Sequence, residues 1–473
     1  MGVHVDGDGV AQLVGLALRR NPRRAHLLVS RVLGKHVPTD PRLVRAAGLA
    51  LGALVAEVLD GRVRPRVDLG PALDGEPGAA AAARDAAVAI AASVTVSAGS
   101  GSSVTVPAGS GSSVTVPAGS GSSVTVLGYA ETATALGHLV AEALDADVYL
   151  HSTRRSVPGA SAAGGFAEEH SHATEHLLLP SDPGVLTGSG PLVLVDDELS
   201  TGRTVANTLR ALHLLAPRSH YVVAALVDLR TPQDHAVLQR LAAELGSRVD
   251  VVALAAGTVR VPEDVLVAGA ALVAAHAPGA AVGAGSGTPV LTHPVLTLPV
   301  LADPVRVDLG WPVALPDGGR HGVLRAHRAR LEVELPAMAA RLAATLPRTG
   351  EVLVLGFEEL MHAPLRLAEA LADAYPGLVV RSSTTTRSPV LAVDAAGYAI
   401  RHRLVFAAHD HPADGPGERY AYNIAPGRFD AVVLVVDTPG DTPELAVLLQ
   451  ALAGVTASVV LAVLPSYLPE GPQ

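Results

Sequence analysis

The sequence predicts an α/β protein that is built on parallel sheets and divided into two domains. Short apolar runs alternate with segments of helical spacing, which is typical of strand–helix–strand units. At 473 residues the chain is too long for a single ordinary core, and its 49% of hydrophobic residues allow a large buried interior. One apolar run ends in two adjacent carboxylates and a small-residue turn that opens a helix.

The first domain is expected to contain a five-stranded unit. Its predicted strands are short apolar runs at residues 124–128, 148–151, 192–195, 221–227 and 249–255. Its predicted helices carry apolar residues at helical spacing and span residues 132–144, 203–215 and 233–245. The first 70 residues are expected to be mostly helical and to cover one edge of this sheet.

Two low-complexity segments interrupt this pattern. Ser-Val-Thr-Val recurs four times between residues 93 and 126, and no copy has a large enough apolar side chain to stack as a solenoid. We interpret residues 93–122 as a flexible insertion and only the last copy as the first strand of the sheet. Residues 276–318 are rich in Gly and Pro and are expected to link a first domain (1–275) to a second (319–473).

The second half repeats landmarks of the first. Residues 322–346 have helical spacing, and the strand–helix pattern resumes after them. The matching pairs of segments are those that begin at Val124 and Val352, residues 151–158 and 383–390, and residues 192–204 and 432–442. Three landmarks in the same order predict that the second domain is a degenerate copy with similar topology, although any two α/β units share some of this rhythm.

The strongest chemical signal is the segment that begins at Pro191. Its apolar strand ends in Asp196 and Asp197, and a small-residue turn at 200–202 then opens a helix. Backbone N–H groups at a helix N-terminus bind phosphate, and Gly202 lets the backbone approach closely. The two carboxylates can accept hydrogen bonds from vicinal ribose hydroxyls and share Mg²⁺. The alternative is a Walker-B-like strand end, but the sequence has no Gly-Lys-Ser/Thr loop to support it.

This segment resembles the motif that binds phosphoribosyl pyrophosphate (PRPP) in type I phosphoribosyltransferases of the orotate phosphoribosyltransferase-like kind. The resemblance implies the type I phosphoribosyltransferase fold for the first half, with Asp196 and Asp197 as catalytic and Mg²⁺-binding residues that hold the ribose hydroxyls. It implies that the 5-phosphate is held by Ser200, Thr201, Gly202, Arg203 and Thr204. A loop that presents amides to the diphosphate is implied at Gly128, Tyr129, Ala130, Glu131 and Thr132. After the second strand a pyrophosphate-binding arginine is expected, and Arg154 is preferred to Arg155.

Two further groups are candidate site residues. Glutamates and histidines crowd residues 168–176, which suggests a metal site or a general acid/base on a mobile loop. In the resembled family this is the position of the flexible catalytic hood, and Glu169 and His170 are our catalytic candidates there. A structural zinc site and a charged, solvent-facing helix are the alternatives. Lys35, the only lysine, and His36 are candidates to reach the diphosphate or the acceptor.

The resemblance extends to the second half. With Thr-Arg-Ser-Pro at residues 386–389, the order of landmarks resembles bacterial proteins that join such a transferase to a TRSP domain. Those proteins are associated with tellurium-resistance and stress operons, which are thought to make a nucleoside-like metabolite. Here Asp437 is kept but Val436 replaces the neighbouring acid, so productive PRPP binding by this half is not expected. The half is either an inert structural lobe or holds a separate pocket made by Arg387, His409, Asp410 and His411.

The function predicted is therefore a Mg²⁺-dependent phosphoribosyltransferase. It would move the phosphoribosyl group of PRPP to a nitrogenous base or related acceptor and release pyrophosphate. A regulator that senses PRPP without chemistry is the alternative. A PRPP synthetase ranks third, because its intact phosphate motif belongs to the second domain of its tandem pair.

Composition excludes several partners and sites. The net charge of −10 and the 3% of aromatic residues argue against a nucleic-acid partner. Because the sequence has no cysteine, disulfides and thiolate metal sites are excluded. The first residues lack the pattern of a signal peptide, and no window reaches 18 apolar residues, so a cytoplasmic protein without a membrane partner is expected. A homodimer is compatible with these observations.

Overall fold

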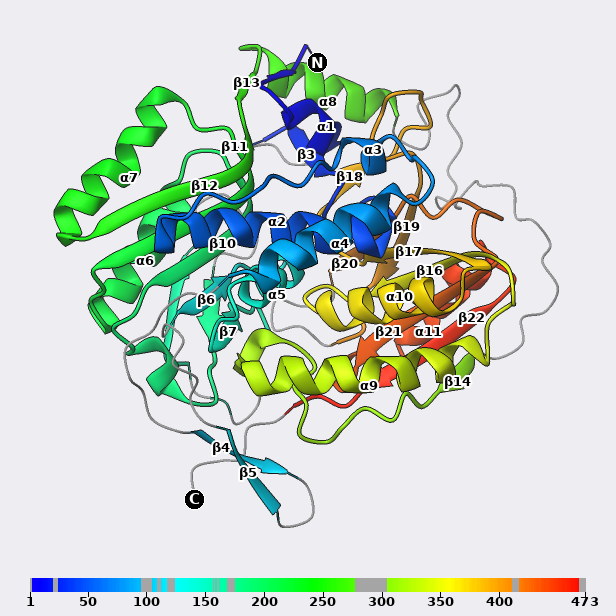
Figure 1. Cartoon of the computed structure of the whole chain (residues 1–473). Helices are drawn as coiled ribbons and strands as arrows, with labels where there is room; N and C mark the ends of the chain where they lie inside the picture. The colour runs from blue at the N-terminus through cyan, green and yellow to red at the C-terminus, as the bar shows by residue number, and fades with distance from the viewer. Residues whose placement is uncertain are drawn as a thin grey trace.

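The computed structural model describes most of the chain (Figure 1). The described residues are 2–19, 24–94, 104–108, 112–116, 124–155, 157, 160, 162–167, 175–276, 304–410 and 417–467. Most of the Ser/Gly repeat and of the expected linker lies outside them. The same holds for residues 168–174, which include Glu169 and His170, and for His411.

The first half contains the five-stranded parallel unit that the sequence predicts. Its strands are β6 (Thr125–Gly128), β7 (Val148–His151), β10 (Leu192–Leu199), β11 (His220–Asp228) and β12 (Arg248–Ala256). Their order in space is β12-β11-β10-β6-β7, and all four pairings are parallel. The central strands are continuous runs of buried Val, Leu and Ala, as expected for a parallel sheet that is covered on both faces.

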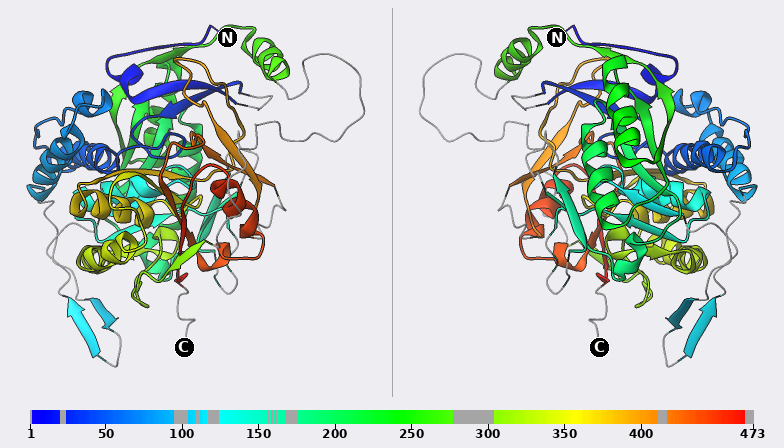
Figure 2. Two further views of the ribbon diagram at one scale, coloured as in Figure 1. Left: turned by 90° about the vertical axis from the view of Figure 1, so that its right-hand side faces the viewer. Right: turned by 90° about the vertical axis from the view of Figure 1, so that its left-hand side faces the viewer.

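Helices connect these strands on both faces of the sheet. α5 (Thr134–Ala143) leads from β6 to β7, whereas α6 (Arg203–Leu215) and α7 (Pro232–Leu245) follow β10 and β11. Because right-handed crossovers run in opposite directions from β6 and β10, α5 lies on one face, and α6 and α7 lie on the other. The green helices α6 and α7 stand in front of the sheet in the right-hand view of Figure 2.

Two features of this sheet differ from the prediction. β10 does not end at Val195 but continues to Leu199, because its ladder with β11 runs on through Asp196 and Glu198. A ladder is made by backbone groups, so acidic side chains do not by themselves end a strand. A sixth strand, β15 (Val323–Leu324), comes from the second half and pairs antiparallel with β7.

The prediction that the N-terminal segment is mostly helical is wrong. This segment forms β1 (His4–Asp6), α1 (Val10–Leu13), β2 (Val14–Arg19), β3 (His26–Ser30) and α2 (Pro41–Asp60). β2 and β3 are short apolar runs, and the periodicity of such runs does not distinguish a strand from a helix. They pair with each other, and β18 (Val390–Leu391) of the second half extends their sheet.

α2 packs closely against α5. Asp40 caps its first turn, Pro41 occupies the first helical position, and Gly61 ends it with a φ of 73°. A Cβ on Gly52 would lie 2.4 Å from the Cβ of Ala143 on α5. The helices therefore approach so closely that only glycine fits at this position.

The second half forms its own parallel sheet. Its strands are β14 (Val305–Val307), β16 (Gly350–Gly356), β17 (Leu378–Thr384), β21 (Ala431–Asp437) and β22 (Val459–Leu464). The order β14-β22-β21-β16-β17 contains β22-β21-β16-β17, which repeats β11-β10-β6-β7 of the first sheet strand for strand. The predicted second α/β domain of similar topology is thus confirmed. β14 falls inside the segment that we expected to be a linker.

Shorter elements complete both halves. The remaining helices are α3 (Gly70–Leu73), α4 (Ala79–Ala92), α8 (Val265–Ala275), α9 (Arg325–Ala343), α10 (His362–Ala374) and α11 (Leu445–Ala453). Short 3-10 turns span Pro183–Leu186, Gly319–His321 and Thr438–Gly440. The remaining strands are β4 (Val104–Ala108), β5 (Ser112–Val116), β8 (Gly164–Ala167), β9 (Glu175–Leu178), β13 (Thr258–Arg260), β19 (Arg403–Ala407) and β20 (Glu418–Tyr422).

Two copies of the Ser-Val-Thr-Val repeat form β4 and β5, which pair only with each other in the described part of the chain. Among the described residues of the repeat, the last copy alone enters the main sheet, as β6, which is the strand that the sequence predicts. β4 and β5 project away from the body of the molecule (Figures 1 and 2).

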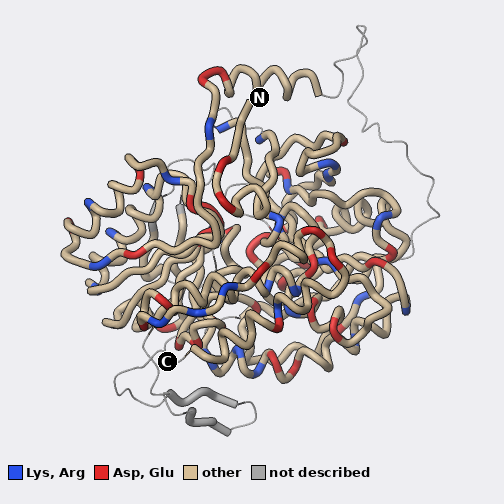
Figure 3. Tube along the Cα trace, turned by 45° about the horizontal axis from the view of Figure 1, so that its top comes forward, with Lys and Arg blue, Asp and Glu red and all other residues tan. Residues whose placement is uncertain are grey.

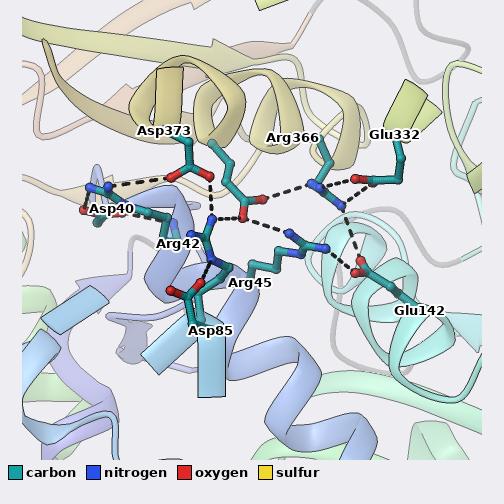
Figure 4. Close-up of polar contacts among 10 residues, drawn as sticks. Asp40, Arg42, Arg45, Asp85, Glu142, Glu332, Arg366 and Asp373 are labelled. Atoms are coloured by element: carbon teal, nitrogen blue, oxygen red, sulfur yellow. Dashed lines mark hydrogen bonds and ion pairs between the residues drawn. The ribbon is translucent and has the colours of Figure 1, made fainter. Parts of the chain in front are cut away.

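The two halves share a core and a network of ion pairs. Met361 and Leu365, next to and within α10, belong to the same hydrophobic cluster as the first sheet. Beside them, Glu369 of α10 pairs with Arg45 of α2 at 2.9 Å and with Arg84 of α4 at 2.9 Å. Figure 4 shows the network around this contact, in which Glu142 of α5 pairs with Arg45 of α2 and with Arg366 of α10.

Acidic and basic residues are interspersed along both halves of the trace (Figure 3). No helix in the described part of the chain is both long and apolar enough to cross a membrane.

Candidate active site

A cavity of about 800 Å³ lies at the carboxyl ends of β6 and β10. The chain leaves β6 toward β7 and leaves β10 toward β11, in opposite directions along the sheet. Ligands of open α/β sheets bind in the crevice at such a point of reversal. The volume falls in the range of sites for small molecules.

The motif after β10 forms one wall. All residues from 196 to 204 line the cavity. Gly202 has a φ of 72° and precedes the first residue of α6, and no side chain caps this helix end. The Arg203 N–H donates to Thr201 Oγ1 at a long 3.4 Å, and a helix N-terminus without a close cap suits the phosphate site expected at residues 200–204.

Asp196 and Asp197 stand beside this turn. The backbone N–H of Asp197 donates a hydrogen bond to Asp196 Oδ1 at 2.9 Å. Burial, together with the charge of Glu198, raises the pKa of Asp197. Glu198 in turn pairs with Arg24 of the N-terminal segment at 2.6 Å.

These carboxylates are compatible with Mg²⁺ but not with a complete protein cage. Among the described residues, no three His, Asp or Glu side chains converge as metal ligands would. Mg²⁺ in phosphate-transfer sites is commonly held by one or two carboxylates together with substrate oxygens. Asp196 and Asp197 fit that requirement.

The loop after β6 forms the facing wall. Tyr129, Ala130, Glu131 and Thr132 all line the cavity. The peptide bond between Ala130 and Glu131 is cis. The Ala130 N–H donates to Ser152 Oγ at 3.0 Å, which ties the loop to the residues that follow β7.

Three cations surround Glu131. Lys35 Nζ lies 3.1 Å from Glu131 Oε2 and donates to Thr132 Oγ1 at 2.9 Å. Burial alone would raise the pKa of Glu131, but the charges of Lys35, Arg387 and Arg154 lower this pKa to about 2. Glu131 is therefore ionised at neutral pH.

Gly128 and Arg155 do not line the cavity, in contrast to our expectation. A Cβ on Gly128 would lie 2.5 Å from the hydroxyl of Tyr149, so glycine serves packing there. Arg155 is directed to the second half, where its Nη1 donates to Asp437 Oδ2 at 2.6 Å and its Nε lies 3.1 Å from Asp410. The preference for Arg154 agrees with its position on the cavity wall.

His36 lines the cavity, but its ring is buried. Burial and the neighbouring Lys35 charge lower the pKa of His36 well below its ordinary value, so the ring is neutral. Glu169 and His170 lie outside the described residues.

The second half contributes the remaining wall. Arg387, Ser388 and Pro389 of the Thr-Arg-Ser-Pro segment line the same cavity, together with residues 417–420. Of the four residues that we considered for a separate pocket, Arg387 lines this cavity, His409 and Asp410 do not, and His411 lies outside the described residues. Arg387 faces the first-half site, and His409 is buried with its ring stacked 4.3 Å from that of Phe357.

The two halves exchange matching contacts. Equivalent residues of the two halves are found by counting onward from the last paired residues of β6 and β7 in the first half and of β16 and β17 in the second. By this count Thr153 is equivalent to Thr386, and Glu131 is equivalent to Glu359. Thr153 Oγ1 donates to Glu359 Oε2 at 2.7 Å, and Thr386 Oγ1 donates to Glu131 Oε2 at 2.9 Å. The halves thus face each other like two copies related by an approximate two-fold axis.

The equivalent site of the second half is filled by protein. Arg155 approaches Asp437 from the first half, and Arg320 lies 3.5 Å from Glu359 and 3.8 Å from Asp437. These arginines lie at the strand ends where a ligand would bind in the first half.

Sequence reasoning missed several residues of the cavity. Arg24 and His26 come from the segment around β3, which we expected to be helical. Arg419 and Tyr420 come from β20 of the second half. No local pattern places these residues beside the phosphate motif, although the internal repeat is a signal that the halves have equivalent edges.

Comparison with known proteins places these features in a family. A family model described as phosphoribosyl transferase matches residues 13–258, which is more than half of the chain. A second model, described as the TRSP domain C-terminal to that transferase domain, matches residues 317–452. No curated protein matches the chain at a significant level.

Parts of the chain are also similar to solved adenine phosphoribosyltransferases. The Trypanosoma brucei structure is 17% identical, with a TM-score of 0.22, over 28% of this chain and 56% of its own. The Giardia lamblia structure is 16% identical, with a TM-score of 0.22, over 39% and 83%. The Leishmania donovani structure is 16% identical, with a TM-score of 0.23, over 43% and 79%. The match thus spans only about half of the trypanosomal chain.

Proposed function

This chain belongs to the phosphoribosyl transferase family, and we propose that it transfers the phosphoribosyl group of PRPP to a nitrogenous base or related acceptor. One observation carries the proposal: the phosphate turn at 200–204, the paired carboxylates and the loop at 129–132 line one cavity. The cavity is large enough for PRPP together with a small acceptor. The resemblance of residues 386–389 to TRSP proteins of stress operons supports a nucleoside-like product.

In the proposed reaction a nitrogen of the acceptor attacks C1 of the ribose and gives up its proton to solvent. The bond from C1 to the diphosphate oxygen breaks, and its electron pair leaves with pyrophosphate. Asp196 and Asp197 hold the ribose hydroxyls, and the amides at the start of α6 hold the 5-phosphate. Lys35 and Arg154 face the charge that gathers on the leaving diphosphate. Mg²⁺, when bound with Asp196 or Asp197, neutralises part of that charge.

Isothermal titration of PRPP with Mg²⁺ tests this proposal. Wild type is expected to bind, and the double variant Asp196→Asn/Asp197→Asn is expected to lose binding. Each substitution removes one acceptor oxygen for the ribose hydroxyls and the negative charge that Mg²⁺ requires. Asp74→Asn/Glu76→Gln is the matched control, since it removes two exposed carboxylates outside the cavity. Its affinity for PRPP should equal that of wild type.

If PRPP binds, candidate acceptor bases are screened for the release of pyrophosphate. Release with one class of base identifies the acceptor and supports the transferase. Binding without release for any base favours the sensing regulator. Wild type that does not bind PRPP contradicts both functions.

A further inference from the structure

We propose that the second half supplies a ligand to the substrate: Arg387, in the Thr-Arg-Ser-Pro segment, binds the diphosphate of PRPP in the first-half cavity. This inference rests on the proposed function. It gives the second half a direct part in the site, in place of the inert lobe that the sequence left open.

The first argument is position. Counted from the paired strand ends, Arg387 of the second half is equivalent to Arg154 of the first. Both residues nevertheless line the same cavity, beside the loop at 129–132. They do so because the halves face each other and the second half's own site is occupied by Arg155 and Arg320.

The second argument is charge. Among the described residues that line the cavity, seven are Arg or Lys and five are Asp or Glu. Three of these cations, Lys35, Arg154 and Arg387, act together on the buried Glu131 and lower its pKa to about 2. A diphosphate group has the charge that such a cluster requires.

The third argument is rigidity. Arg387 Nε donates to Glu358 Oε2 at 2.7 Å, so the guanidinium is oriented while its side chain is still 13% exposed. The backbone on either side is fixed: Thr386 Oγ1 donates to Glu131, and the Tyr422 hydroxyl donates to the carbonyl of Ser388 at 2.6 Å. A cation held in this way costs little to organise when the diphosphate binds or leaves.

The test compares two ligands that differ in the diphosphate. Pyrophosphate with Mg²⁺ and ribose 5-phosphate are each titrated into the full-length protein. Arg387→Gln is expected to weaken pyrophosphate binding roughly 10- to 100-fold, because a charged hydrogen-bond donor is lost. Its affinity for ribose 5-phosphate should not change, since the phosphate turn at 200–204 is intact. Arg387→Lys should recover part of the pyrophosphate affinity.

Two controls separate binding from folding. Arg401→Gln removes an arginine of the second half that pairs with Asp394 outside the cavity, and it should bind both ligands as wild type does. Circular dichroism shows whether Arg387→Gln is folded. If it is not, Arg387→Lys, which keeps a cation beside Glu358, is compared with wild type and should bind pyrophosphate more weakly but ribose 5-phosphate equally well.

The outcomes are distinguishable. Equal pyrophosphate affinity in wild type and Arg387→Gln overturns this inference and leaves the transferase intact. Parallel loss of both ligands also overturns it, because it indicates general disruption of the site. Wild type that binds neither PRPP nor pyrophosphate overturns the inference and the proposed function together.

Discussion

Asp197→Asn is expected to lower turnover by roughly 100-fold or more while leaving the protein folded. Asp197 lines the same cavity as the phosphate turn and the loop at 129–132, and in the proposed complex the ribose lies between the two phosphate sites. An amide can accept only on its oxygen, so one ribose hydroxyl loses its partner and C1 moves relative to the acceptor. A displacement of about 1 Å at a reacting centre costs on the order of 100-fold in rate.

The fold should survive this change because Asp197 does not stabilise it. Burial and the charge of Glu198 raise the pKa of Asp197, which means that the folded protein disfavours the ionised form. A neutral side chain of the same shape therefore should not lower the free energy of unfolding. Thermal unfolding followed by circular dichroism checks this point.

Turnover is measured as pyrophosphate release with the acceptor that the screen identifies. Asp317→Asn is a matched control, because burial also raises the pKa of Asp317 but this residue lies outside the cavity. Asp317→Asn should keep wild-type turnover. Wild-type turnover in Asp197→Asn would exclude the assignment of the ribose site.

The sequence was sufficient for the parallel strands and for the helices between them. Strands that are buried on both faces have continuous apolar sequences, so β7 and the start of β10 could be located from the sequence alone. β2 and β3 could not, because short apolar runs fit a strand or a helix, and β18, which pairs with β2 and completes their sheet, lies more than 350 residues away. The pairing between strands, and not the local sequence, determines that β2 and β3 are strands.

The residues of the site also fall into those that could be predicted from the sequence and those that could not. Asp196, Asp197 and the turn after them are contiguous, so their chemistry could be predicted from their order. Lys35 and Arg387 reach Glu131 from distant segments, and only the packing of the halves brings them together. The internal repeat indicated two equivalent domains, but it carried no information on which edges would meet.

The stability of the contact between the two halves should depend strongly on Glu369. This carboxylate of α10 is only 2% exposed and contacts Arg45, Arg84 and Arg366, three arginines from three helices. In Glu369→Ala the guanidinium groups of these arginines remain partly buried but lose the carboxylate of Glu369 as a partner. Removing one partner of a buried ion pair costs about 3–5 kcal/mol, so a loss of stability of that size is expected in denaturant unfolding.

Glu332→Ala is the matched control for this change. Glu332 also pairs with Arg366, as Figure 4 shows, but its side chain is 47% exposed. Solvent screens such a pair, and its loss should cost only about 0–1 kcal/mol. If both variants lose the same stability, burial of Glu369 is not what matters at this contact.

The pH dependence gives an independent check with a definite sign. Burial by itself would raise the pKa of Glu369, but Arg366, Arg45 and the hydrogen bonds from Arg84 and Arg45 outweigh it and lower this pKa below its ordinary value. The stabilisation is thus complete above the unfolded-state pKa of about 4.3 and is lost as the pH falls through the folded-state value. The stability difference between wild type and Glu369→Ala should therefore be constant near neutrality and should narrow only in acid. A difference that instead narrows between pH 6 and 8 would mean that another group titrates at this contact, since no carboxylate with a lowered pKa does so there.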